Sequence, residues 1–294
     1  MKQISLICLF ALVLMVFSGC APQETTTDLV ATTLPVYQFT TLLCQGTGLT
    51  VTQLVTESVS CLHDYTLNIR QVKAIEGAKL VILSGAGLED FMAESLAGKQ
   101  TLDAAMGISL LESCHDHDHG NDEHGHGHEP EMDAHIWLSP ANALVMAENI
   151  CNGLKASFPE HAVMLDANFQ VLQSQILALQ EYGRQQLSQL RCRDIITLHD
   201  GFAYFAEAFD LTILAAVEEE SGSEASAQEL IALIYLIRDH KLPAIFTEQN
   251  GATAAATTLA AETGIAVFTL DIAMSGDWFA AMYHNIDTMK EALG

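Results

Sequence analysis

The sequence has 294 residues, of which 50% are hydrophobic, and it carries a formal net charge of −25 at pH 7. A chain of this length and apolar content can bury one or two cores of ordinary size. Its acidity repels nucleic acid and anionic lipid head groups, so neither is expected as a binding partner.

Residues 1–19 are typical of an export signal peptide. A single early cation, Lys2, precedes an apolar run over residues 4–17 and then the small residues before Cys20. The apolar run is too short to span the ~30 Å hydrocarbon layer of a membrane comfortably. Residues 17–20, Phe-Ser-Gly-Cys, resemble the lipobox of bacterial lipoproteins, although Phe17 stands where that motif usually has Leu. The resemblance implies lipidation of Cys20, followed by a polar tether over residues 20–28.

Short apolar segments rich in β-branched residues alternate with helix-length segments in the rest of the chain. In the first half, the expected strands are 29–33, 51–55, 80–84 and 108–111. In the second half, they are 195–198, 212–217, 244–247 and 266–270. This alternation predicts an α/β fold of two lobes, each with a roughly four-stranded parallel sheet.

Residues 115–129 interrupt this alternation, because they include no apolar side chain that a core could bury. The segment is therefore expected to be a solvated loop. Imidazoles interleaved with carboxylates suit zinc and its first-row neighbours, so the loop is predicted to collect metal ions with little selectivity. Its histidines are His115, His117, His119, His124, His126 and His128.

Apolar residues at three- and four-residue steps, from Leu165 to Leu190, predict one long helix over residues 159–190. At 1.5 Å per residue such a helix would be roughly 46 Å long, enough to run across two lobes. The expected organisation is thus an N-terminal metal-binding lobe over 29–158, this connecting helix, and a C-terminal metal-binding lobe over 191–294.

Four further residues lie at or just after the ends of predicted strands, where ligands gather in open α/β sheets. They are His63, His135, His199 and Asp271, and the first and last pairs are each separated by 72 residues. Each half would then supply two ligands to one metal site between the lobes. By residue type alone, however, a histidine after a strand is more often a structural hydrogen-bonding group. The remaining histidines, on predicted helices, are expected to be structural or surface residues: His161, His240 and His284.

The segments around these ligands closely resemble, in order, the motifs of the zinc- and manganese-type solute-binding lipoproteins of ABC importers. The matching segments are His63-Asp64-Tyr65, Asp133-Ala134-His135-Ile136-Trp137-Leu138-Ser139-Pro140, His199-Asp200-Gly201-Phe202-Ala203-Tyr204-Phe205, Glu262-Thr263-Gly264-Ile265-Ala266-Val267 and Leu270-Asp271. The resemblance spans essentially the whole chain after the signal peptide. It implies two α/β lobes joined by a rigid helix, with a metal ion held between them by three histidines and an oxygen ligand. A histidine-rich loop before the second ligand implies a zinc-type member.

The sequence departs from these motifs at four positions. Leu62 and Ala134 replace the Pro before the first and second histidines, Gly201 replaces an Ala, and Ile272 replaces the Pro after Asp271. Water or another carboxylate is therefore the alternative to Asp271 as the fourth ligand. At the end of a strand, Glu248 is expected near the ligands rather than among them.

Together these features predict an exported lipoprotein, anchored on the outer face of the cytoplasmic membrane or facing the periplasm. It would capture a divalent metal ion and deliver it to the permease of an ABC importer, acting as a monomer and not as an enzyme. Zinc is the expected ion, and the same ligands accept manganese or iron(II). The alternatives are a metal-buffering or adhesive surface lipoprotein and a zinc hydrolase, for which the sequence has no HExxH motif.

Overall fold

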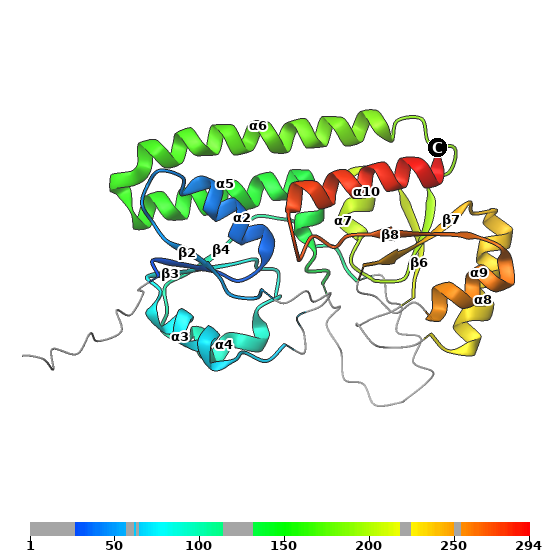
Figure 1. Ribbon diagram of the computed structural model, residues 1–294, viewed down its shortest axis with the longest axis horizontal. Coiled ribbons are helices and arrows are strands. Elements are labelled where there is room, and N and C mark those ends of the chain that lie inside the picture. Colours follow the sequence, from blue (N-terminus) through cyan, green and yellow to red (C-terminus); the bar gives the residue numbers. More distant parts are fainter. Residues whose placement is uncertain (1–26, 57–61, 63–64, 114–131, 218–224, 250–253) are drawn as a thin grey trace, which may run out of the picture.

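The computed structural model describes residues 27–56, 62, 65–113, 132–217, 225–249 and 254–294 (Figure 1). These residues form two four-stranded sheets with strand orders β2-β1-β3-β4 and β6-β5-β7-β8. Every strand pairing within the two sheets is parallel. The prediction of two α/β lobes with four parallel strands each is confirmed. The signal peptide, Cys20 and most of the tether lie outside the described residues.

The first lobe is centred on a fully buried strand. Its strands are β1 (Leu29–Ala31), β2 (Val51–Gln53), β3 (Leu80–Leu83) and β4 (Thr101–Asp103). Its helical elements are α2 (Leu34–Leu43), α3 (Ile69–Gly77), η1 (Asp90–Met92) and α4 (Ala93–Leu96). Because β1 pairs on both sides, with Leu29 opposite Val51 and Leu80, its three apolar residues occupy the middle of the sheet.

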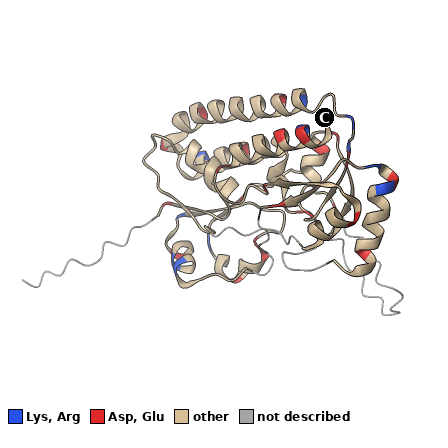
Figure 2. Cartoon of the chain, turned by 45° about the vertical axis from the view of Figure 1, so that its right-hand side comes forward, with Lys and Arg blue, Asp and Glu red and all other residues tan. Residues whose placement is uncertain are grey.

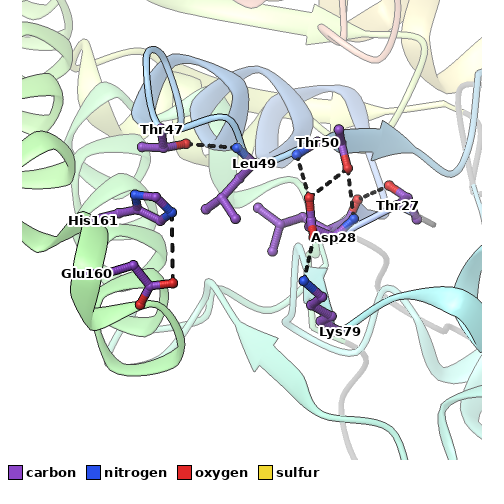
Figure 3. A network of polar contacts seen from close by, with 9 residues as sticks. Thr27, Asp28, Thr47, Leu49, Thr50, Lys79, Glu160 and His161 are labelled. Atoms are coloured by element: carbon purple, nitrogen blue, oxygen red, sulfur yellow. Dashed lines mark hydrogen bonds and ion pairs between the residues drawn. The ribbon is translucent and has the colours of Figure 1, made fainter. Parts of the chain in front are cut away.

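A polar network ties the starts of three of these strands together (Figure 3). The Asp28 carboxylate accepts hydrogen bonds from the amide and hydroxyl of Thr50 at 3.0 and 2.9 Å and pairs with Lys79 at 2.8 Å. The Lys79 contact is the main reason why the pKa of Asp28 is lowered. These residues precede β1, β2 and β3, so the network holds the sheet at the edge opposite the carboxyl ends of its strands.

The predicted strand at 108–111 is wrong. These residues are described and form no strand, and the fourth strand of the first sheet is the earlier β4. Thr101 and Asp103 are exposed, so this edge strand lacks the apolar run by which strands were identified. Ile108 and Leu111 pack, partly buried, against the main core. The apolar run therefore marks burial of a connecting segment and not strand pairing.

The two central strands of the second sheet are almost entirely buried. Its strands are β5 (Asp194–Thr197), β6 (Thr212–Ala216), β7 (Ala244–Glu248) and β8 (Ala266–Leu270). Its helices are α7 (Ala203–Ala208), α8 (Ala227–His240), α9 (Ala254–Thr263) and α10 (Trp278–Leu293). The strands predicted in this half all form, with ends that differ by a residue or two.

A long helix spans both lobes, as predicted. After η2 (Ile136–Leu138) and α5 (Pro140–Ser157), the chain continues through η3 (Pro159–His161) into α6 (Ala162–Gln186). Helix α6 packs on α2 and α5 at one end and on α10 at the other (Figure 1). It ends earlier than predicted, because the chain turns at Leu187, although that side chain is still buried in the core.

The two lobes share one continuous core. Its largest cluster of buried residues includes Phe39 in the first lobe and Phe246 in the second. Across the lobes, Gln38 Oε1 accepts a hydrogen bond from the Trp278 amide at 2.7 Å, and the rings of Phe39 and Trp278 meet edge to face. Acidic residues lie on helices of both lobes (Figure 2). Within the described ranges, no helix has the length and apolar character needed to cross a membrane.

Candidate metal centre

Two of the four predicted ligands lie side by side. The ring centroids of His135 and His199 are 5.2 Å apart and the ring planes are 85° apart. A zinc ion ~2.1 Å from one nitrogen of each ring, at the tetrahedral angle, would separate the two centroids by about 5 Å. Both residues are buried, with exposed fractions of 7% for His135 and 3% for His199. The arrangement of this pair therefore fits two imidazoles that share one tetrahedral ion.

A buried carboxylate orients the ring of His135. Asp133 Oδ1 accepts a hydrogen bond from the His135 backbone amide at 2.8 Å and lies 2.8 Å from His135 Nδ1. A carboxylate only accepts, so this contact keeps the proton on Nδ1 and leaves the lone pair of a neutral ring on Nε2. Carboxylate–histidine pairs of this kind orient the ligands of zinc sites. Asp133 was part of the matched motif, but its role was not predicted from the sequence.

The backbone next to His135 is fixed by a buried turn and a capped helix. Ile136, Trp137 and Leu138 of η2 are all buried. Ser139 then caps α5 by accepting a hydrogen bond from the Asn142 amide at 3.4 Å, and Pro at the first helical position suits the start of the helix. His135 thus enters the site from a segment that has little freedom to move.

His199 follows β5, and the space beside its ring explains glycine at 201, one of the departures from the family motifs. A Cβ atom built on Gly201 would lie 2.8 Å from His199 Cδ2, 2.9 Å from His199 Nε2 and 2.8 Å from Ile272 Cδ1. Real Cβ atoms essentially never come so close to other heavy atoms. A side chain at 201 would therefore collide with both the ring of His199 and Ile272, and glycine leaves that space to them.

Asp271 follows β8, and its contacts are with its own lobe. Its carboxylate Oδ1 accepts a hydrogen bond from the Ala273 amide at 2.7 Å. Its backbone amide and carbonyl bond the side-chain amide of Asn285 at 2.8 and 2.7 Å. Across the described part of the chain, no group of three or more His, Cys, Asp or Glu side chains could hold a metal ion. The structure thus brings His135 and His199 together but does not group Asp271 with them.

His63 and the six loop histidines, from His115 to His128, lie outside the described residues, so their roles stay predictions. The residues that flank His63 are anchored. Leu62 is buried in the main core, and the Tyr65 hydroxyl accepts a hydrogen bond from Gln71 Nε2 at 2.7 Å. Glu248, the last residue of β7, is buried and lies opposite Leu270, which directly precedes Asp271. The structure therefore places Glu248 at the same sheet edge as Asp271.

The other described histidines make contacts elsewhere. His240 Nδ1 lies 3.0 Å from Asp194 Oδ2, and His284 Nε2 lies 3.1 Å from the carbonyl of Thr269. His161 lies 3.9 Å from the carboxylate of its neighbour Glu160 (Figure 3). Each of these rings has a local polar partner, in keeping with the structural role expected for them.

Sequence reasoning missed a buried carboxylate at the carboxyl ends of β1 and β3. Glu89 accepts hydrogen bonds from the Thr32 hydroxyl at 2.5 Å and from the amides of Ser84 and Gly85 at 2.7 and 3.0 Å. Burial outweighs these bonds and raises the pKa of Glu89 to about 7. No motif marks this residue, and only its packing distinguishes it from a surface glutamate.

Comparisons with known proteins agree with the resemblance. The family described as "ZnuA: Zinc-uptake complex component A periplasmic" matches residues 29–292. The zinc-binding lipoprotein AdcA of Streptococcus pneumoniae is 27% identical over 307 aligned positions, which cover 99% of this chain and 61% of AdcA. The chain therefore spans about three fifths of the length of this curated relative.

Solved structures share the fold. A crystal structure of ZnuA has a TM-score of 0.78 and 28% identity, covering 91% of this chain and 100% of that one. The periplasmic zinc-binding protein TroA from Treponema pallidum has a TM-score of 0.77 and 22% identity, covering 92% and 99% of the two chains. With a family match over nearly all of the folded residues and the same two-lobed fold, this chain belongs to the ZnuA family of periplasmic zinc-uptake components.

Proposed function

We propose that this protein captures a divalent metal ion, zinc in the first place, between its two lobes and delivers it to the permease of an ABC importer. The observation that carries the proposal is the buried pair of His135 and His199, whose separation suits one tetrahedral ion. His63 would supply the third nitrogen. Asp271, water or another carboxylate would supply the fourth ligand. Membership of the ZnuA family and the zinc-binding names of its relatives support this choice of cargo.

The chemistry of the ligands suits capture followed by release. Neutral imidazoles need no deprotonation at pH 7, yet they compete with protons near their ordinary pKa of ~6.5. The carboxylate of Asp133 prepares Nε2 of His135 as the lone-pair donor before any ion arrives. A site of this kind binds a metal ion tightly without a covalent step, and no catalytic role is proposed for it.

The location proposed for the protein follows from its N-terminal sequence. Residues 1–19 would be removed on export, and lipid on Cys20 would anchor the tether 20–28 at the outer face of the cytoplasmic membrane or facing the periplasm. One relative is itself named a lipoprotein. Lobes over 29–158 and 191–294, joined by the helix region 159–190, would then present the metal site to the permease. The loop histidines would raise the local concentration of metal ions.

Metal analysis of the purified chain tests this proposal. Protein prepared without added metal should retain one tightly bound ion per chain after weakly bound ions are removed by dialysis, and zinc should compete effectively with manganese in titrations. H135A and H199A should each lower zinc affinity by orders of magnitude, because a tetrahedral site loses a quarter of its ligands. H240A is the matched control, since His240 contacts Asp194 away from the pair. Equal zinc affinity in all three variants would refute the assignment.

Delivery is tested separately in cells that depend on this importer for zinc. The full-length chain should restore growth on limiting zinc, whereas H199A should not. A chain that binds zinc tightly but fails to restore growth would indicate metal buffering without transport. Turnover of ester, peptide or phosphate substrates by the zinc-loaded chain would instead support the hydrolase alternative.

A further inference from the structure

One buried hydroxyl connects the two segments that carry the neighbouring histidines. Tyr204 lies in α7, shortly after His199, and only 1% of it is exposed. Its hydroxyl accepts a hydrogen bond from the Leu111 amide at 3.0 Å and donates one to the Asp133 carbonyl at 2.9 Å. The Asp133 amide in turn donates to the Leu111 carbonyl at 2.9 Å. A single phenol therefore holds two backbone segments of the first lobe against a helix of the second.

The connection continues into the site through side chains already described. Asp133, whose carbonyl receives the Tyr204 bond, contacts His135 Nδ1 through its own carboxylate. Tyr204 follows His199 within the same buried turn and helix, in which Phe202 and Phe205 are also fully packed. Tyr204 and Asp133 thus connect the backbone that carries His199 to the ring of His135.

We propose that Tyr204 is a positioning residue of the metal centre, whose hydroxyl sets the distance between the imidazoles of His135 and His199. The inference rests on the proposed function. Without the hydroxyl, the buried carbonyl of Asp133 and the partly buried amide of Leu111 would both lose a partner, and Asp133 would be free to shift relative to α7. His135 would move with it, because its backbone amide and its ring are both bonded to the Asp133 carboxylate.

The state of the phenol suits this role. Burial raises the pKa of Tyr204 to about 12, so the hydroxyl stays protonated over the whole range in which the protein would meet metal ions. It can therefore donate to the Asp133 carbonyl and accept from the Leu111 amide at the same time. Phenylalanine at this position would keep the packed ring and remove only these two bonds.

The decisive variant is Y204F, with Y182F as its matched control. Tyr182 also uses its hydroxyl in one hydrogen bond, to Asp287 Oδ1 at 2.6 Å, but it joins α6 to α10 at the surface. We expect Y204F to weaken zinc and cobalt(II) binding about 10- to 100-fold, the range typical of groups that orient metal ligands. Y182F should stay within about twofold of the wild type. The visible absorption of bound cobalt(II), which reports ligand geometry, should change in Y204F alone.

An unchanged affinity and cobalt spectrum in Y204F would overturn the inference, and so would a loss of thermal stability without either change. If Y204F does not fold, hydrogen exchange on the unmodified chain provides the test. Zinc should slow exchange of the Leu111 amide more than that of amides near Tyr182, and an equal effect at both places would overturn the inference.

The proposed function and the positioning role fail differently. If wild type and H135A bind zinc equally, the metal centre is misplaced and both ideas fall. If H135A loses zinc while Y204F retains wild-type affinity and spectrum, the metal centre stands and only the role of Tyr204 is refuted.

Discussion

Gly201 and Ile272 lie together beside the ring of His199, so closely that a Cβ atom on Gly201 would lie 2.8 Å from Ile272 Cδ1. These are two of the positions at which the sequence departs from the motifs of metal-importer lipoproteins. Because a methyl group at 201 would meet both the His199 ring and Ile272, glycine at 201 leaves room for both side chains.

This pairing predicts the effects of exchanging the two residues. G201A should destabilise the fold by ~1–3 kcal/mol, the usual cost of overpacking, and should weaken zinc binding because the new methyl group presses on His199. I272V removes only Cδ1 and should by itself cost ~0.5–1.5 kcal/mol. In the double variant, the loss measured by denaturant unfolding should be smaller than the sum of the two. Strict additivity would show that the side chains do not compete for space.

Asp133 offers a second test of how the site is prepared. D133N keeps an oxygen near His135 but removes the charge that favours the proton on Nδ1, so zinc affinity should fall about 10- to 100-fold. Its matched control is D194N, because Asp194 holds the ring of His240 in a similar contact at 3.0 Å, away from the site. Isothermal titration of both variants with zinc decides the matter, and similar affinities would argue against a role for Asp133 in orienting His135.

The chain's two tryptophans should report metal binding. Trp137 donates its indole hydrogen to the Ile272 carbonyl at 2.8 Å, and Trp278 donates to the Trp137 carbonyl at 3.0 Å. The Trp137 ring also meets that of His135 edge to face, with centroids 5.3 Å apart. Zinc should therefore change the tryptophan emission spectrum, and W137F should lose most of this change while W278F keeps it. An emission change that survives in W137F and vanishes in W278F would contradict this geometry.

Glu89 predicts an unusual dependence of stability on pH. Its pKa is raised from an ordinary 4.5 to about 7 in the folded protein, so the folded state holds this proton more tightly than the unfolded state does. The stability that Glu89 contributes is then fully present below pH 4.5 and is lost as pH rises through 7. Between these two pH values, the contribution of Glu89 to the free energy of unfolding falls by about 3 kcal/mol.

The control for this effect is E89Q, which cannot ionise. Urea denaturation from pH 4 to 8 measures the free energy of unfolding of both proteins. As pH rises, that of the wild type should fall relative to that of E89Q. Subtracting the unfolding free energy of E89Q from that of the wild type removes the contributions of carboxylates with lowered pKa, such as Asp28, whose effect on stability runs in the opposite direction. A difference that does not vary with pH would show that Glu89 does not titrate in this range.

Much of the local structure could be predicted because each segment carries its own signal. Buried strands such as β1 and β7 contain short apolar runs, and the stripe from Leu165 to Leu179 marks the inner face of α6. The same reasoning failed at β4, whose exposed residues have no apolar run, and at 108–111, where burial occurs without strand pairing. Periodicity reports which side chains are buried, but it does not report which backbone groups pair.

For the site, the sequence by itself determined the type of ligand, and hence His135 and His199 as candidates. His199 follows β5 as expected, whereas His135 directly precedes η2 and does not follow a strand. Only the tertiary structure decided that these two rings lie 5.2 Å apart, that Asp133 and Tyr204 hold them there, and that Asp271 is bonded within its own lobe. The physical reason is that a residue's chemistry and local periodicity are properties of its own segment. The distance between segments far apart in the chain depends instead on how the whole core packs.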